Sequence, residues 1–286
     1  MNNSNISIIV PACNEAEGLD AILPGLVQLY AGAEIIVVND GAADDREQVC
    51  RRYPVRLINR PHRMGNGAAI KTGAREATGE VLVFMDADGQ HNPQDIALLL
   101  TELERGHDMA VGARSRGAHQ NVFRMAANSL YNQLASWITS YRIPDLTSGL
   151  RAVRAKRFRE FLHFLPNGFS YPTTITMAFM RAGYSVAYVN VNVQVRLGSS
   201  HIRPLRDGLR FLLIIFKVGT LYSPLKFFAP ISFLIFMAGL SWYLYIYLSQ
   251  GRFTNMSALL FTTSMLVFFI GIVSEQLTML FYRDKN

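Results

Sequence analysis

The chain has 286 residues, of which 50% are hydrophobic and 17% are charged. This balance excludes a disordered or fibrous protein, and it is more apolar than that of an ordinary soluble domain. The two cysteines, Cys13 and Cys50, lack the spacing of metal ligands, which favours a reducing compartment. The formal net charge of +7 indicates an anionic partner, either nucleic acid or a membrane surface.

The first 200 residues alternate short β-rich runs with helical stretches. The predicted strands are residues 6–10, 34–38, 55–58 and 80–85, and the predicted helices lie near residues 15–30, 44–52 and 65–78. This alternation predicts an α/β domain built on a largely parallel sheet. Because ligands of such sheets bind beyond the carboxyl ends of the strands, the residues that follow each strand are the candidates for chemistry.

Two carboxylates, Asp86 and Asp88, follow the fourth predicted strand, and Gln90 adds an amide oxygen. Mg2+ and Mn2+ prefer oxygen ligands and are commonly held by one or two carboxylates. A D-x-D sequence alone is more often a turn, but two desolvated carboxylates after a buried strand would repel each other without a cation. We therefore expect Asp86, Asp88 and Gln90 to hold a divalent cation, with His91 as a weaker candidate.

Two further segments have a functional and a structural interpretation each, and both stay open. Asp40, followed by Gly41, either accepts a hydrogen bond from the imino group of a nucleotide base or caps the next helix through an Asx turn. Gly65 and Gly67 open a helix that carries Lys71. Small residues at this position either let a ligand approach the backbone amides or let the helix pack closely on the sheet.

Two apolar runs, residues 227–248 and 256–281, are each long enough to cross the hydrocarbon core of a membrane. Buried helices of this length in a soluble protein normally show a polar face, so a transmembrane hairpin is favoured. Glu275 lies near the end of the second run, where it would snorkel toward water or pair across the helices.

Residues 203–226 are rich in basic side chains, among them Lys226, with leucines at helical spacing between them. This pattern predicts a helix in the membrane interface with its basic residues toward lipid headgroups, and it argues against nucleic acid as the partner. The positive-inside rule then places the N-terminal domain and the tail in the cytoplasm. The expected location is the inner (cell) membrane, as a multi-pass protein. The expected domains are residues 1–202, 203–226 and 227–286, and no N-terminal signal peptide is expected.

Four segments, in this order, resemble the family 2 glycosyltransferases: residues 7–15, 37–41, 65–67 and 86–93. The resemblance covers residues 6–202 and implies a nucleotide-sugar-binding, Rossmann-like GT-A fold, in which the D-x-D pair coordinates a metal on the donor diphosphate. Ala42 and Ala43 depart from the Ser or Thr that is usual there. The positions that the resemblance implies for binding the nucleotide sugar are Pro11, Asn14, Glu15, Asp40, Gly65, Gly67, Lys71, Asp86 and Ala87.

The second half of the domain is similar to dolichyl- or polyprenyl-phosphate sugar synthases, of the dolichol-phosphate mannosyltransferase-like kind. The similar segments are residues 111–114, Arg124 with Asn128, residues 145–151 and residues 195–201, where His201 replaces the usual Lys. The resemblance implies that arginines bind the lipid phosphate or the donor diphosphate and that Asp145 lies near the reacting centre, although Asp145 could equally cap its own turn. The implied catalytic residues are Asp86, Asp88, Asp145, Arg114, Arg124 and Arg196.

The expected activity is therefore inverting transfer of a hexose, of the mannose or glucose type, from a UDP- or GDP-linked sugar to undecaprenyl or dolichyl phosphate on the cytoplasmic face. A processive polysaccharide synthase, which uses a sugar hydroxyl as acceptor, is disfavoured because one hairpin provides no conduit. A non-catalytic membrane scaffold is disfavoured by the intact Asp86 and Asp88. A homo-oligomer is compatible with the sequence.

Overall fold

The computed structural model of the chain describes residues 2–41, 46–114, 122–168, 170–194, 216, 219–220 and 223–283, without the side chains of residues 122–128 and 281–283. The chain divides into two compact units. The first comprises Met1–Leu134 with Tyr141–Gly208, and the second comprises Ala135–Ser140 with Leu209–Asn286.

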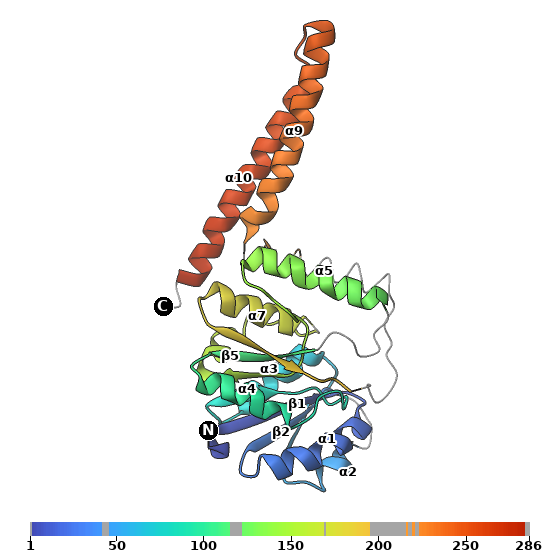
Figure 1. Cartoon of the computed structure of the whole chain (residues 1–286), viewed down its shortest axis with the longest axis vertical. Helices are drawn as coiled ribbons and strands as arrows, with labels where there is room; N and C mark the ends of the chain where they lie inside the picture. Colours follow the sequence, from blue (N-terminus) through green and yellow to red (C-terminus); the bar gives the residue numbers. More distant parts are fainter. Residues whose placement is uncertain are drawn as a thin grey trace. The chain divides into compact units, whose positions relative to one another are not determined.

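A mixed sheet forms the centre of the first unit (Figure 1). Among the described residues its strands are β1 (Ile6–Ala12), β2 (Glu34–Asn39), β3 (Arg56–Asn59), β4 (Val81–Phe84), β5 (Met109–Arg114), β6 (Arg151–Arg154) and β7 (Val186–Val191). Their order is β3-β2-β1-β4-β6-β5-β7. All described neighbours pair in parallel except β6, which is antiparallel to both β4 and β5. The predicted α/β class is confirmed, and the four predicted strands coincide with β1 to β4.

Helices connect the strands of the first unit. They are the short 3-10 helix η1 (Asn3–Asn5) and the α-helices α1 (Ala16–Leu29), α2 (Arg46–Cys50), α3 (Asn66–Glu76), α4 (Asp95–Glu104), α5 (Val122–Thr139), α6 (Ala155–Glu160) and α7 (Tyr171–Arg181). The predicted helices near residues 15–30, 44–52 and 65–78 correspond to α1, α2 and α3. The last turn of α5 belongs to the second unit.

Both faces of the sheet are covered, which explains why all seven residues of β1 are buried. Alternate β1 residues such as Ile8 and Val10 share one hydrophobic core with α1 and α4. On the opposite face α3 lies so close to β1 that a Cβ atom on Gly73 would be 2.4 Å from Cγ2 of Ile9. The sheet is therefore the middle layer of three, as in other doubly covered α/β domains.

The strand directions bring distant segments to one edge of the sheet. β1, β2, β4 and β5 all end at this edge, because they run in the same direction. β6 runs in the opposite direction, so the residues that precede it, 145–150, reach the same edge from the other side. The topology alone thus places Asp40, Asp86, Arg114 and Asp145 at one edge.

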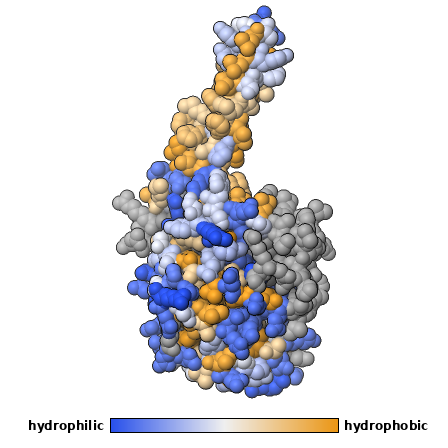
Figure 2. All heavy atoms as spheres, in the orientation of Figure 1, coloured by the Kyte–Doolittle hydropathy of each residue, from blue (hydrophilic) through white to orange (hydrophobic). Residues whose placement is uncertain are grey.

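In the second unit, α9 (Pro224–Gln250) and α10 (Asn255–Arg283) form a hairpin that contains both predicted apolar runs. Both helices are long and apolar enough to cross a membrane, and most of their side chains are exposed. Apolar residues occupy much of the visible surface of the hairpin (Figure 2). A core helix of a soluble protein would be mostly buried, so this exposure is typical of helices that face lipid.

Small and polar residues hold the two helices of the hairpin together. Ser232 Oγ donates to the carbonyl of Ser264 (2.8 Å), and Ser264 Oγ donates to the carbonyl of Ser232 (2.9 Å). A Cβ atom on Gly271 would lie 2.7 Å from Cβ of Phe228, so the backbones approach closely there. Close approach through small residues and hydrogen bonds between hydroxyls are common devices for packing helices in membranes.

Two charged residues of the second unit have defined partners; Glu275 follows one of its two expected roles, and Lys226 departs from its expected one. Glu275 Oε2 accepts a hydrogen bond from the backbone nitrogen of Leu225 (3.3 Å), so it pairs across the helices at the N-terminus of α9. Lys226 was expected to face lipid headgroups, but its Nζ donates to the carbonyls of Trp137 (3.3 Å) and Ile138 (2.8 Å). These carbonyls lie in the last turn of α5 and carry the negative end of the helix dipole, which attracts the ammonium group. The remainder of the predicted interfacial segment lies almost entirely outside the described residues.

Candidate active site

The turn after β4 carries the two aspartates of the D-x-D sequence. Asp88 is 7% exposed, and its Oδ1 accepts a hydrogen bond from the backbone nitrogen of Gln90 (3.1 Å). Asp86 Oδ1 accepts from Nδ2 of Asn66 (3.4 Å), at the start of α3. Gln90 is tied by its own backbone carbonyl to the nitrogen of Gln194 (2.9 Å), in the segment after β7. The turn is therefore held by one hydrogen bond of its own and by two from parts of the chain that are far apart in sequence.

Two glycines allow other segments to approach this turn. A Cβ atom on Gly149 would lie 1.9 Å from Oδ2 of Asp86, and one on Gly18 would lie 1.9 Å from the carbonyl oxygen of Ala87. A Cβ atom on Gly149 would displace the carboxylate of Asp86, and one on Gly18 would displace the backbone of the turn. Spacing along the sequence gives no sign of these contacts, and they became visible only in three dimensions.

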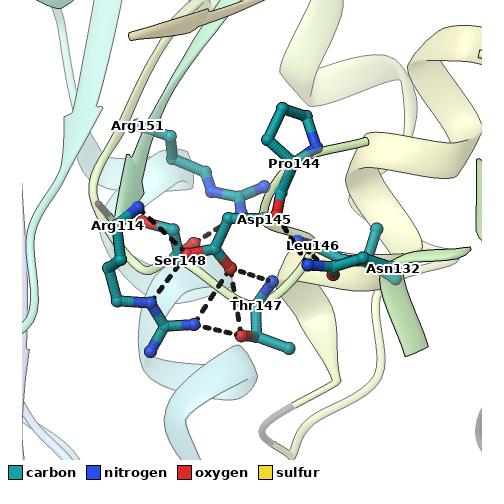
Figure 3. A network of polar contacts seen from close by, with 8 residues as sticks. All are labelled: Arg114, Asn132, Pro144, Asp145, Leu146, Thr147, Ser148 and Arg151. Carbon is teal, nitrogen blue, oxygen red and sulfur yellow. Dashed lines mark hydrogen bonds and ion pairs between the residues drawn. The ribbon is translucent and has the colours of Figure 1, made fainter. Parts of the chain in front are cut away.

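Arg114 and Asp145 form a bidentate ion pair beside this turn (Figure 3). Nε of Arg114 donates to Oδ2 of Asp145 (2.7 Å), and Nη2 donates to Oδ1 (2.9 Å). The carboxylate also accepts from the backbone nitrogens of Arg114 (3.3 Å) and Thr147 (3.0 Å). Arg114 ends β5 and Asp145 lies before the antiparallel β6, so the sheet topology creates the pair.

The electrostatics of the pair follow from its surroundings. Burial raises the pKa of Asp145, but the hydrogen bonds and charge of Arg114 outweigh it and hold this pKa below its ordinary value. Burial likewise lowers the pKa of Arg114, but Asp145, and after it Asp86 and Asp88, outweigh this effect and raise it. Arg114 thus lies in the field of three carboxylates and stays protonated.

Asp40 follows β2 and is 3% exposed. Its carboxylate accepts from Nη1 of Arg60 (2.8 Å) and from the backbone nitrogens of Met64 (3.0 Å) and Gly65 (2.7 Å). In this structure Asp40 therefore anchors the loop that leads into α3. Neither a base contact nor an Asx turn describes these bonds, and binding of the nucleoside by Asp40 stays a prediction.

The start of α3 packs against the loop of residues 165–168. The backbone nitrogen of Ala68 donates to the carbonyl of Asn167 (3.0 Å), and Nζ of Lys71 donates to the carbonyl of Leu165 (3.0 Å). A Cβ atom on Gly67 would lie 2.2 Å from the carbonyl oxygen of Pro166. These contacts are close packing against a loop, not the packing on the sheet that the structural interpretation described. The role of Gly65, Gly67 and Lys71 toward a ligand stays a prediction.

The remaining predicted residues have simple placements. Pro11 is buried in β1 opposite Val38, and Asn14 is exposed with φ 58°, in the turn that leads into α1. Glu15 Oε2 accepts from the backbone nitrogen of Cys13 at the same edge (3.5 Å). His91 is 6% exposed, and burial lowers its pKa, so it is neutral in this position. The side chains of Arg124 and Asn128, and all of Ala42, Ala43, Arg196 and His201, lie outside the described residues.

The chemistry of Asp86 and Asp88 fits a divalent cation that also binds a ligand phosphate. Within the described residues no group of three or more His, Cys, Asp or Glu side chains could hold a metal ion. The chain would therefore contribute two carboxylates, and the other ligands would come from Gln90, water or phosphate. Mg2+ is commonly held in this way, because it keeps open positions for substrate oxygens.

Comparison with known protein families bears on these observations. The sequence pattern described as "Glycosyl transferase family 2" matches residues 7–162, which carry β1 to β6 and the Arg114–Asp145 pair. The chain belongs to glycosyl transferase family 2. A second pattern, described as "GtrB C-terminal hairpin", matches residues 223–280 of this glycosyltransferase, the segment of α9 and α10.

Several curated proteins are similar to this glycosyltransferase. A dolichol-phosphate mannosyltransferase of Pyrococcus furiosus is 36% identical over 38% of this chain and 33% of its own length. An undecaprenyl-phosphate 4-deoxy-4-formamido-L-arabinose transferase of Proteus mirabilis is 29% identical over 53% of this chain and 49% of its own. An uncharacterized glycosyltransferase of Mycobacterium bovis is 28% identical over 76% of this chain and 99% of its own. The chain thus spans a third to about half of the length of the first two relatives.

Solved structures support the fold. A glucosyl-3-phosphoglycerate synthase of Mycobacterium tuberculosis, crystallised with Mn2+, UDP and glucosyl-3-phosphoglycerate, superposes with a TM-score of 0.61 at 20% identity. The match covers 75% of this chain and 80% of that one. The first unit therefore has the GT-A fold of family 2 glycosyltransferases, as the sequence predicted.

Proposed function

We propose that this glycosyltransferase transfers a sugar from a nucleoside diphosphate sugar to a polyprenyl phosphate at a membrane surface. The observation that carries the proposal is the combination in one chain of a family 2 domain with an apolar hairpin of the GtrB C-terminal type. A soluble acceptor would not require helices whose exposed side chains are apolar. The Pyrococcus and Proteus relatives are named for transfer to polyprenyl phosphates, which supports the same acceptor class.

The charged residues at the carboxyl ends of the strands are compatible with a phosphate as the acceptor group. A phosphate monoester is largely dianionic near neutral pH, since its second pKa is about 6, so it attacks without a general base. A sugar hydroxyl would need a base. Asp145 is a weak base, because Arg114 lowers its pKa through a bidentate pair. The pair therefore serves better to orient charge than to remove a proton.

The proposed reaction is a single displacement with inversion at the anomeric carbon. A phosphate oxygen of the acceptor forms the new bond to this carbon, while the bond to the donor diphosphate breaks and the nucleoside diphosphate leaves with the electron pair. Asp86 and Asp88, with Gln90, would hold a divalent cation, Mg2+ or Mn2+, which supplies charge stabilisation to the leaving diphosphate. Arg114 would offer positive charge beside it, and Arg124 and Arg196 are proposed to bind phosphate groups.

Pro11, Asn14, Glu15, Asp40, Gly65, Gly67, Lys71 and Ala87 are proposed to line the donor side of this site. A hexose of the mannose or glucose type on UDP or GDP is the proposed donor, and undecaprenyl or dolichyl phosphate is the proposed acceptor. We place the reaction on the cytoplasmic face of the inner membrane, on the basis of the positive-inside rule.

The test is an incubation of the purified full-length protein in detergent with Mn2+ or Mg2+, polyprenyl phosphate and a panel of radiolabelled UDP- and GDP-sugars. Label from one donor should move into the organic extract, and EDTA should abolish the transfer. Asp88→Asn should lower transfer by about 100-fold or more, because a charged ligand of the cation is lost. Asp20→Asn, which alters an exposed partner of Arg52, is the matched control and should leave transfer unchanged. Label that stays in the aqueous phase with every donor, or full activity of Asp88→Asn, would contradict the proposal.

A further inference from the structure

Asn132 of α5 contacts the backbone on both sides of Asp145 (Figure 3). Its Nδ2 donates to the carbonyl of Pro144 (2.6 Å), and its Oδ1 accepts from the backbone nitrogen of Leu146 (3.1 Å). Asn132 lies 13 residues before Asp145, in a helix that precedes the turn, so these are tertiary contacts. One side chain thus bridges the residue before and the residue after the aspartate.

The two bonds constrain more than either could alone. A carboxamide is planar and presents its NH2 donor group and its oxygen acceptor in fixed relative positions. Because Nδ2 faces a carbonyl and Oδ1 faces an N–H group, only one orientation of the amide satisfies both bonds. The bonds therefore fix the position and the rotation of the 144–146 backbone, from which the side chain of Asp145 projects.

The orientation of this backbone determines whether the Arg114–Asp145 pair can form. The bidentate geometry requires both oxygens of Asp145 to face Nε and Nη2 of Arg114, at 2.7 and 2.9 Å. Asp145 is 6% exposed and Leu146 is fully buried, so the turn cannot relax into solvent without moving core residues. A rotation of the turn would break the two parallel hydrogen bonds between Arg114 and Asp145. Two buried charges would then be poorly paired, which is costly in free energy.

We infer that Asn132 is a positioning residue for the transfer reaction. It holds the Asp145 turn so that Arg114 and Asp145 keep their bidentate contact beside Asp86. The inference rests on the proposed function. Neither the D-x-D pattern nor the arginine motifs includes Asn132. A side chain with a purely structural role would stabilise the fold without a specific link to Asp145, and this difference can be measured.

The first test is a double-mutant cycle in the full-length protein. Asn132→Ala should lower kcat for transfer by about 10- to 100-fold with little change in KM for the nucleotide sugar, because small misplacements of catalytic groups cost this much. In an Asp145→Asn background, Asn132→Ala should have little further effect on kcat, because the residue acts through Asp145. Gln133→Ala, an exposed amide on the same helix, is the matched control and should leave kcat unchanged.

The second test does not depend on activity. Hydrogen–deuterium exchange of peptides that cover residues 143–150 should become about fivefold faster in Asn132→Ala, as expected when the Leu146 amide loses its acceptor, and unchanged in Gln133→Ala. Asn132→Asp keeps the acceptor for Leu146 but turns the donor toward Pro144 into an acceptor. It should therefore lose kcat while keeping most of the protection at Leu146.

The outcomes separate this inference from the proposed function. If the wild type transfers no sugar to polyprenyl phosphate, the proposed function fails, and exchange alone then decides whether Asn132 holds the turn. Unchanged exchange in Asn132→Ala, or losses of kcat that simply add to those of Asp145→Asn, would overturn the inference. A fall in melting temperature with normal kcat would assign Asn132 to stability only.

Discussion

At the scale of single residues, Gly149 illustrates how a missing side chain shapes the site. Its Cα lies against the carboxylate of Asp86, and a Cβ atom would sit 1.9 Å from Oδ2. We expect Gly149→Ala to displace Asp86 and to lower transfer by about 100-fold, with weaker activation by Mn2+. The measurement is kcat as a function of Mn2+ concentration. Gly168→Ala, where no atom lies within 4 Å of the added Cβ, is the control and should behave as wild type.

A second residue-scale prediction concerns Glu34, at the start of β2. Burial raises its pKa, but bonds from Ser7 Oγ (2.5 Å) and from the nitrogen of Thr78 (2.8 Å) outweigh burial and lower it. A carboxyl with a lowered pKa stabilises the fold above its unfolded-state value, about 4.3, and this contribution is lost as the pH falls through the folded-state pKa. Glu34→Gln should therefore lower Tm at pH 7, and the difference from wild type should vanish toward pH 3. A difference that is constant across this range would contradict the assignment.

The sequence predicted the residues at strand ends well, because parallel strands deliver their carboxyl ends to one edge regardless of the details of packing. The positions of Asp86, Asp88 and Asp40 at this edge were predicted in this way, and their roles stay predictions. The contacts of Gly18 and Asn132 were not predicted, because each residue reaches the site from a helix elsewhere in the chain. Only the folded backbone shows which helical residue faces a given turn.

At the scale of secondary structure, β1 to β4 were predicted within two residues, because each apolar run ends at turn-forming or charged residues. Strands β5, β6 and β7 were not predicted, and the most informative of them is the antiparallel β6. It has four residues and begins with Arg151, which is fully buried and donates to the carbonyls of Ser148 (2.6 Å) and Pro172 (3.2 Å). A short strand that starts with a buried arginine has no apolar pattern, and its direction is set by its two neighbours in the sheet.

Several cations of the chain contact the carboxyl ends of helices. Arg154 Nη2 donates to the carbonyl of Leu103 in α4 (2.9 Å), and Arg159 Nε donates to the carbonyl of Ala74 in α3 (3.1 Å). Lys226 does the same at α5. These carbonyls lie in the last turns of their helices, so a cation adds a hydrogen bond there and matches the helix dipole. Some of the basic side chains therefore stabilise helix ends. The net charge of the chain overstates the number of positive charges that can bind lipid headgroups.

The contact of Lys226 with α5 leads to a prediction for this helix. Lys226→Met keeps the length of the side chain but removes its bonds to the last turn of α5, so we expect the stability of the second unit to fall by about 1 kcal/mol. Thermal unfolding in detergent, combined with hydrogen exchange of peptides covering residues 135–140, would measure the loss. Arg252→Met, in the exposed turn of the hairpin, is the control. Equal melting curves and equal exchange for both variants would show that the lysine does not stabilise the helix end.

At the scale of the whole molecule, the chain joins an α/β unit to an apolar hairpin, and the proposed topology requires both ends of the hairpin on one side of the membrane. Single cysteines test this in a background with Cys13→Ser and Cys50→Ala. A membrane-impermeant maleimide added to sealed vesicles should label Asn2→Cys from one side only and Arg252→Cys from the opposite side only. Labelling of both positions from the same side would exclude a spanning hairpin.

The close contact between α9 and α10 has a consequence for the route of the proposed polyprenyl phosphate acceptor. Besides the paired serines, Gly239 lies against Leu260, where a Cβ atom would be 3.0 Å from Cβ of the leucine. With the backbones this close at several levels, an isoprenoid tail cannot thread between the two helices. The tail would have to lie along the outer surface of the hairpin. Larger outward-facing side chains should therefore reduce transfer to long acceptors more than to short ones. Substitutions between the two helices should not change this preference for acceptor length.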